Sequence, residues 1–114
     1  MKKPEEEFNK YRERMNEKIL AHDNQTIRRF FNLDTAAYRG GALDCKVKEM
    51  LGLVASMVLR CDDCIRYHLQ RCKEEGVNRD ELFELFGIAL LVGGSIVIPH
   101  LRRAVEFQDA LDEA

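Results

Sequence analysis

The sequence has few helix-breaking residues and no long apolar run. Only two prolines occur in 114 residues, so little in the chain interrupts helices. The longest apolar run covers residues 88–98 and includes two glycines and a serine. It is much shorter than the ~20 residues that a membrane-spanning helix needs. The first residues also lack the apolar segment of a signal peptide, so we expect a cytoplasmic protein with no membrane partner.

Neither sign of charge dominates the chain. The net charge is −2 and the pI is about 5.9, which gives no support for nucleic acid as a partner. Apolar residues make up 46% of the chain and charged residues 33%, as in a globular protein. The length predicts a single domain over residues 1–114 with a modest core. A chain of this size often completes its core by forming a homo-oligomer.

Apolar residues recur at intervals of three and four along most of the chain, which predicts an all-α protein. An apolar stripe through residues 8–19 indicates an amphipathic first helix. A second, short helix is predicted over residues 26–38, and a pair of glycines then breaks the chain. Further helices are expected over residues 45–59, 62–75, 78–92 and from 95 onward, which together make a compact bundle of about six helices.

The third helix carries the most apolar residues. Asp44 is placed to cap its N-terminus. Leu53 and Leu59 widen an apolar face that already includes Leu51. We therefore expect this helix to be buried on most sides.

Local signals also mark the boundaries of the later helices. Gly76 suits the position that ends the fourth helix, and Asn78 followed by Glu81 resembles a capping box for the fifth. Ser95 is expected to cap the sixth helix, with a proline in its first turn, unless residues 95–98 form a short strand. The predicted core positions of the fifth helix are Leu82, Leu85, Phe86, Ala89 and Val92.

Thiol chemistry is concentrated in the segment Cys61-Asp62-Asp63-Cys64, which His68 follows. One helical turn brings the two sulfurs close enough to bridge, and the unpaired N–H groups at a helix start stabilise thiolates. Such cysteines reach pKa values of ~3.5–7.5 instead of ~8.5. His68 lies four residues after Cys64 on the same helical face and can exchange a proton near neutral pH. Asp62 and Asp63 oppose thiolate formation unless they point to water, and the sequence leaves that open.

Glu49 is the next candidate for a chemical role. It lies in the apolar third helix, where a carboxylate needs a partner or a proton. If the third and fourth helices pack side by side, Glu49 approaches His68 and Cys64. The alternative is that Glu49 is a partly exposed helix residue.

A zinc site is the main alternative for the cysteines. Disulfide staples are rare in a reducing compartment, which leaves thiol chemistry or a metal. Cys61, Cys64, His68 and Cys72 are residue types that zinc takes. The last three would spread over ~12 Å of one continuous helix, which is too far for one ion. We therefore favour a redox pair, with no metal.

Three other residues carry weaker signals. Cys72 is expected in the core, facing a neighbouring helix, although a third thiol in the relay is an option. Cys45 is expected to be structural or partly exposed. His100 is expected to cap a helix start, and the alternative is a place near the active site of an assembled oligomer.

The arrangement of Glu49, eleven intervening residues and Cys61-x-x-Cys64-x-x-x-His68 resembles a known signature. It is that of the alkylhydroperoxidase D-like branch of the carboxymuconolactone decarboxylase family. The similar region covers approximately residues 40–112. This resemblance implies an all-helical fold that assembles as trimers or hexamers.

The resemblance also implies a reaction, the thiol-dependent reduction of organic hydroperoxides without a bound cofactor. It makes Cys64 the peroxidatic cysteine, which becomes a sulfenic acid. It makes Cys61 the resolving cysteine, which closes the disulfide and takes electrons from a dithiol or lipoyl-type donor. Glu49 and His68 would form the proton relay.

Two other functions stay open. The first is a general thiol–disulfide oxidoreductase with no preference for peroxides, which would form the same disulfide. The second is a non-catalytic oligomeric module whose cysteines bind zinc or simply pack. That module predicts stoichiometric zinc, or thiols that react only after unfolding.

Overall fold

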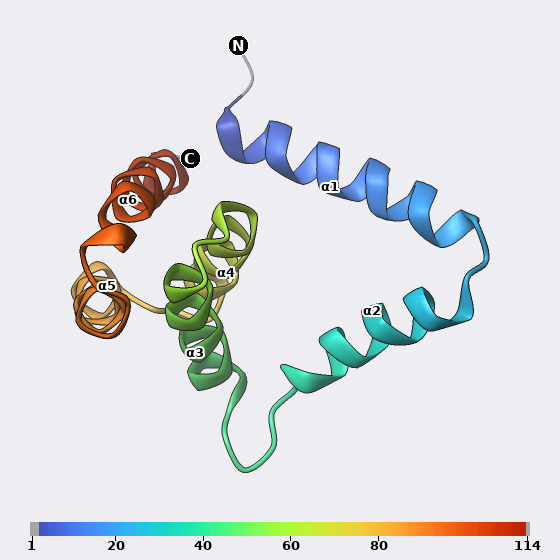
Figure 1. Ribbon diagram of the computed structural model, residues 1–114, viewed down its shortest axis with the longest axis horizontal. Helices are drawn as coiled ribbons and strands as arrows, with labels where there is room; N and C mark the ends of the chain where they lie inside the picture. The colour runs from blue at the N-terminus through green and yellow to red at the C-terminus, as the bar shows by residue number, and fades with distance from the viewer. Residues whose placement is uncertain (1–2, 114) are drawn as a thin grey trace. The chain divides into compact units, whose positions relative to one another are not determined.

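Every regular element between residues 3 and 113 is helical. The computed structural model describes these residues, which form six α-helices and one short 3₁₀ helix without a strand (Figure 1). The prediction of an all-α protein of about six helices is confirmed, and the alternative of a strand at residues 95–98 is wrong. The chain divides into two compact units, Met1–Arg39 and Gly40–Ala114. The single domain expected from the chain length stays a prediction.

The first unit contains α1 (Pro4–Ala21) and α2 (Gln25–Ala37). Pro4 lies in the first turn of α1, where its missing N–H is tolerated, and three glutamates follow it at the positive end of the helix dipole. Asn24 caps α2 by accepting a hydrogen bond from the backbone N–H of Ile27 at 3.0 Å. These local signals account for both helices, and α2 lies within one residue of its predicted bounds.

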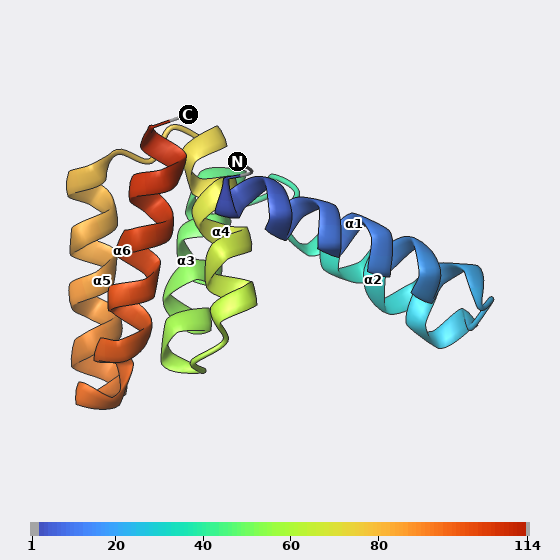
Figure 2. The same ribbon diagram turned by 90° about the horizontal axis from the view of Figure 1, so that it is seen from above.

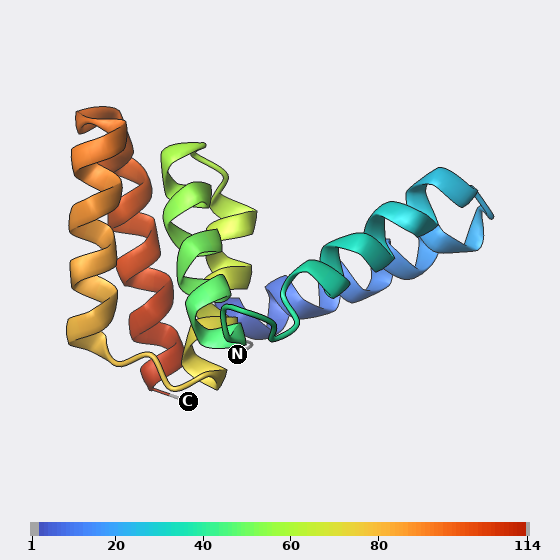
Figure 3. The same cartoon turned by 90° about the horizontal axis from the view of Figure 1, so that it is seen from below.

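The second unit is a bundle of four helices, namely α3 (Cys45–Val58), α4 (Asp62–Glu74), α5 (Arg79–Gly93) and α6 (Ile98–Asp112). The four helices lie side by side in Figures 2 and 3, with α3 packed on α4 and α5, and α4 packed on α6. Burying a large apolar side chain stabilises such a bundle by ~1.5–3 kcal/mol. The buried side chains of its core include Leu53, Met57, Ile65, Leu69, Leu82, Phe86, Val97 and Phe107.

Several predicted helix boundaries are confirmed by their hydrogen bonds. Asp44 caps α3 by accepting a hydrogen bond from the Val47 N–H at 2.9 Å. The capping box at α5 is complete, since Asn78 accepts from the Glu81 N–H at 2.8 Å and Glu81 accepts from the Asn78 N–H at 2.9 Å. Gly76 follows the end of α4 with a φ of 85°, the left-handed conformation expected there.

The entry into α6 differs from the prediction. Ser95–Val97 form a 3₁₀ turn, and α6 begins at Ile98 without a side-chain cap, so Ser95 is not its N-cap. The turn buries Val97 completely, close to Gly93. A Cβ on Gly93 would come within 2.5 Å of the Val97 Cγ2 atom. Close packing at a glycine, rather than a polar cap, therefore leads the chain into α6.

The core faces of α3 and α5 are largely the predicted ones, but three residues expected on apolar faces are exposed. Leu53 of α3 is fully buried, whereas Leu51 in the same helix is 56% exposed and Leu59, the C-cap residue, is 77% exposed. In α5, Val92 is 67% exposed. A helix buries positions three or four residues apart, and Leu51 and Leu59 point away from the face that holds Leu53 and Met57. The prediction that α3 is buried on most sides nevertheless holds for most of the helix, since Leu51 and Ala55 are its exposed residues between Cys45 and Val58.

Candidate active site

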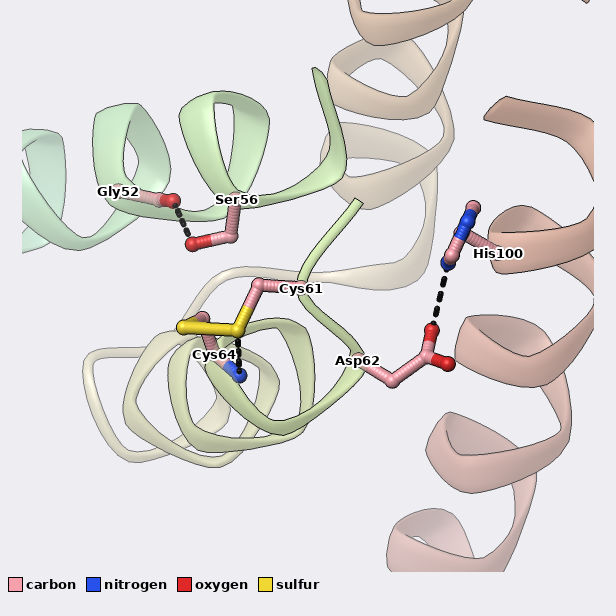
Figure 4. Close-up of a disulfide and its surroundings, with 6 residues drawn as sticks. All are labelled: Gly52, Ser56, Cys61, Asp62, Cys64 and His100. Carbon is pink, nitrogen blue, oxygen red and sulfur yellow. Dashed lines mark hydrogen bonds and ion pairs between the residues drawn. A yellow bond between two sulfur atoms is a disulfide. The ribbon is translucent and has the colours of Figure 1, made fainter. Parts of the chain in front are cut away.

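The Cys-x-x-Cys segment forms the N-terminus of α4, as predicted. Cys61 is the N-cap residue of the helix, and its sulfur accepts a hydrogen bond from the Cys64 N–H at 3.2 Å. The two cysteines are joined by a disulfide, with their Cα atoms 5.2 Å apart (Figure 4). Cys64 is exposed and Cys61 is half-buried. A sulfur at a helix N-terminus lies near unpaired N–H groups and the positive end of the dipole, both of which favour a thiolate after reduction.

Glu49 of α3 and His68 of α4 meet between the two packed helices. The Glu49 Oε1 atom lies 2.8 Å from the His68 Nδ1 atom. Glu49 is 1% exposed and His68 is 7% exposed, so the contact is shielded from water. An ionised carboxylate only accepts hydrogen bonds, so with Glu49 ionised the hydrogen in this contact is carried by the His68 Nδ1 atom. The predicted contact between Glu49 and His68 is therefore present.

Arg71 is a further member of this cluster that sequence reasoning missed. Its Nε atom donates to the Glu49 Oε2 atom at 3.4 Å, and its guanidinium also pairs with Glu74 and Glu75. Burial alone would lower the pKa of Arg71, but the bond to Glu74 and the charges of Glu74 and Glu49 outweigh it, so this pKa lies above its ordinary value. Arg71 follows His68 by three residues, and that spacing on one helical face was the available signal.

The two remaining cysteines are free thiols in different surroundings. Cys72 is fully buried, as predicted, and burial together with the charge of Glu49 raises its pKa to about 12. Cys45 is half-buried, and its sulfur lies 3.6 Å from the Arg71 Nη2 atom. Because Cys61 and Cys64 bond to each other, the candidate zinc set of Cys61, Cys64, His68 and Cys72 is not assembled. Within residues 3–113, no group of three or more His, Cys, Asp or Glu side chains is arranged to hold a metal ion.

The two aspartates between the cysteines point to different environments. Asp62 accepts from Arg103 Nε at 3.0 Å, and its other oxygen lies 2.8 Å from the His100 Nδ1 atom (Figure 4). Asp63 is exposed. His100 therefore pairs with Asp62 instead of capping the start of α6, and that expectation is wrong because α6 packs on α4 at this point. Burial would raise the pKa of Asp62, but the bonds to His100 and Arg103 outweigh it and hold the pKa below its ordinary value.

Fold and site together define the class of protein. The family model for the carboxymuconolactone decarboxylase family matches residues 24–107, so the chain belongs to this family. It is similar to a Thermotoga maritima protein with two crystal structures. One is 61% identical, covers 94% of each chain and has a TM-score of 0.92. The other is 60% identical, covers 94% of this chain and 91% of that one, and has a TM-score of 0.90. The second is named as a carboxymuconolactone decarboxylase family protein with a suggested involvement in antioxidative response.

A more distant solved structure belongs to the same family. It is a carboxymuconolactone decarboxylase family protein from Legionella pneumophila, 32% identical, with a TM-score of 0.62 over 94% of this chain and 86% of that chain. Among the helices formed by residues 3–113, none is long and apolar enough to cross a membrane. The chemical roles of Cys61, Cys64, His68 and Glu49 stay predictions.

Proposed function

We propose that this chain is a thiol-dependent hydroperoxide reductase with an antioxidant role. The observation that carries the proposal is the Cys61–Cys64 disulfide at the start of α4, one turn from His68, which is bonded to the buried Glu49. This arrangement combines a thiol pair that can cycle between two oxidation states with a shielded acid–base pair. The suggested antioxidative involvement of the Thermotoga maritima relative supports the same function.

In the first step, the thiolate of Cys64 attacks one oxygen of a hydroperoxide, ROOH. The O–O bond breaks, Cys64 is oxidised by two electrons to a sulfenic acid, and the other oxygen leaves as an alkoxide. His68 takes the proton of the Cys64 thiol and delivers it to the alkoxide, which becomes the alcohol ROH. Glu49 orients His68 and stabilises its protonated form through the contact at Nδ1.

In the second step, the Cys61 thiol attacks the sulfur of the Cys64 sulfenic acid. The disulfide forms and one water molecule leaves. A dithiol donor of protein or lipoyl type then attacks the disulfide and is itself oxidised to a disulfide, which returns both cysteines to thiols. The cycle consumes one hydroperoxide and two thiols, and its steps use only side chains of this protein and the donor.

A thiol map tests this proposal. The reduced, metal-free protein is mixed with a slight excess of an organic hydroperoxide and quenched within seconds by an alkylating agent, and modified cysteines are located by mass spectrometry. We expect a rapid Cys61–Cys64 disulfide, and a trapped sulfenic acid on Cys64 in the Cys61→Ser variant. The Cys45→Ser variant is the matched control, because it removes a free thiol outside the pair while its hydroxyl can still accept a hydrogen bond from Arg71, so it should react at the native rate.

Two outcomes of the map would redirect the assignment. A disulfide that forms no faster with hydroperoxide than with a small disulfide substrate would indicate a general thiol–disulfide oxidoreductase. Cysteines that stay alkylatable throughout, or react only after unfolding, would refute the peroxidase and leave a binding module.

The proposed enzyme is a homo-oligomer, either a trimer or a hexamer. The bundle supports this with exposed apolar side chains that a single chain does not cover, and a second copy would remove them from water. Light scattering of the native protein and of the Leu91→Glu variant tests this. The native mass should be three or six times that of one chain, and the variant should have a lower mass. A native monomer at all concentrations would contradict it. The exposed large apolar side chains from α3 to α6 are Leu51, Leu59, Phe83, Ile88, Leu91, Val92, Ile96 and Ile98.

A further inference from the structure

The turn between the two cysteines is held to α6 by a cluster of three charged or titratable side chains. Asp62 is the first residue of α4, and its two carboxylate oxygens contact different partners on α6. His100 Nδ1 lies 2.8 Å from Oδ1, and Arg103 Nε donates to Oδ2 at 3.0 Å. Figure 4 shows the Asp62 carboxylate directed toward His100 and away from the disulfide.

The charges of this cluster matter because Asp62 is next to Cys61 in the chain. A free carboxylate there would disfavour a thiolate on either cysteine through like-charge repulsion. Arg103 adds a full positive charge to the same group, and its Nη2 atom also lies 3.3 Å from the His100 Nδ1 atom that contacts Asp62. The field that reaches the sulfurs is then the sum of a carboxylate and a guanidinium, not that of the carboxylate alone.

We propose that Arg103, paired with Asp62, compensates the charge of that carboxylate and so sets how readily the Cys61–Cys64 pair ionises after reduction. Asp62 and Arg103 are thus positioning residues, which act through the charge beside the thiols. The importance of this charge compensation for catalysis rests on the proposed hydroperoxide reductase function. The compensation also explains how an acidic Cys-x-x-Cys segment can serve a reaction that needs a thiolate.

The other charged groups near the turn are placed differently. Asp63 in the same turn and Arg60 in the preceding loop are exposed, as Arg103 is, but within the described residues neither forms an ion pair with a neighbouring helix. Arg66 of α4 lies over the Phe107 ring, with its Cζ atom 5.8 Å from the ring centroid. On the side of α3, Glu49 is occupied by His68 and Arg71. Among the groups named here, Asp62 is therefore the charged residue beside the cysteines that forms an ion pair with a neighbouring helix, α6.

The test measures thiol ionisation without peroxide. The full-length protein is reduced, and its iodoacetamide reaction is followed from acid to alkaline pH, with mass spectrometry reporting Cys61 and Cys64 separately. Arg103→Ala leaves the carboxylate uncompensated and should raise the thiol pKa by about half a unit, about threefold less thiolate at neutral pH. Asp62→Asn leaves the guanidinium uncompensated and should lower the thiol pKa by a similar amount. The double variant should return close to the native value.

The controls separate a charge effect from a structural one. Arg102→Ala removes the same charge from an exposed neighbour on α6 and should leave the thiol pKa unchanged. Arg103→Lys keeps the charge and should restore most of the native value, even if Arg103→Ala folds poorly. High salt should shrink all of the shifts. Opposite shifts in the two single variants support the proposal, whereas shifts of the same sign, or none, overturn it. Because iodoacetamide replaces the peroxide, either result holds whether or not the protein reduces hydroperoxides.

Discussion

The buried carboxylate of Glu49 offers the sharpest test of the proposed proton relay. The Glu49→Gln variant keeps the size of the side chain and an oxygen that can accept from His68, but it removes the charge. Hydrogen bonds to charged groups contribute ~1.5–3 kcal/mol each, and Glu49 makes two, to His68 at 2.8 Å and to Arg71 at 3.4 Å. Since one bond survives in neutral form and Arg71 retains Glu74 and Glu75, we expect a loss of about 1–3 kcal/mol in unfolding free energy.

The effect on the reaction should be larger than the effect on stability. A positioned acid–base group contributes ~10²–10⁴-fold to a rate, so hydroperoxide-dependent disulfide formation should slow by about a hundredfold in Glu49→Gln. Rapid quench with an alkylating agent, followed by mass spectrometry, measures this rate, and urea unfolding measures the stability. Both are compared at a temperature where the variant is folded.

A matched control is available on the same arginine. Glu74→Gln removes another carboxylate partner of Arg71, but its side chain is 59% exposed. An exposed ion pair contributes only ~0–1 kcal/mol, so this variant should keep its rate and nearly all of its stability. If Glu49→Gln lost stability while its rate stayed native, Glu49 would have a structural role alone and the relay would be refuted.

Three further predictions concern the bundle that carries the site. Burial raises the Cys72 pKa from 9.0 to about 12, so the unfolded chain loses this proton at a lower pH than the folded chain. The free energy of unfolding should therefore fall as the pH rises through that range. Denaturant titrations of Cys72→Ala should lack this contribution to the pH dependence of stability. Asn78→Ala removes the cap of α5 and should cost ~1 kcal/mol, read as a melting point lower by about 4–8 °C, whereas Asn78→Asp should melt near the native temperature. Gly93→Ala should destabilise by about 1–3 kcal/mol because its Cβ meets Val97, while Gly87→Ala in the same helix has open space and should stabilise. Equal melting points for the two glycine variants would contradict this account of the packing.

Most helix boundaries were predictable because their causes are local. The cap at Asp44, the capping box at Asn78 and the glycine after α4 each act within a few residues. The start of α6 was not, because it depends on how Val97 packs beside Gly93. The exposure of Leu51 and Leu59 was missed for a related reason, since periodicity marks apolar positions without saying which partner covers them.

The site shows the same division between local and long-range causes. The place of Cys61 and Cys64 at a helix start follows from the motif, and the meeting of Glu49 and His68 was expected if the two helices packed side by side. The pairing of Asp62 with His100 crosses 38 residues of sequence and exists only because α6 packs on α4. Charge type alone gave no indication of that partner.

The hydrogen bond from the Cys64 N–H to the Cys61 sulfur makes the backbone a reporter of the redox state. An amide proton resonance depends strongly on the charge of its acceptor, and this acceptor changes between a disulfide sulfur, a thiol and a thiolate. The Cys64 amide signal in a nitrogen–proton NMR spectrum should therefore move with oxidation and with the ionisation of Cys61. A single isotope-labelled residue would allow the redox state of the pair to be followed in solution without any chemical probe on the thiols.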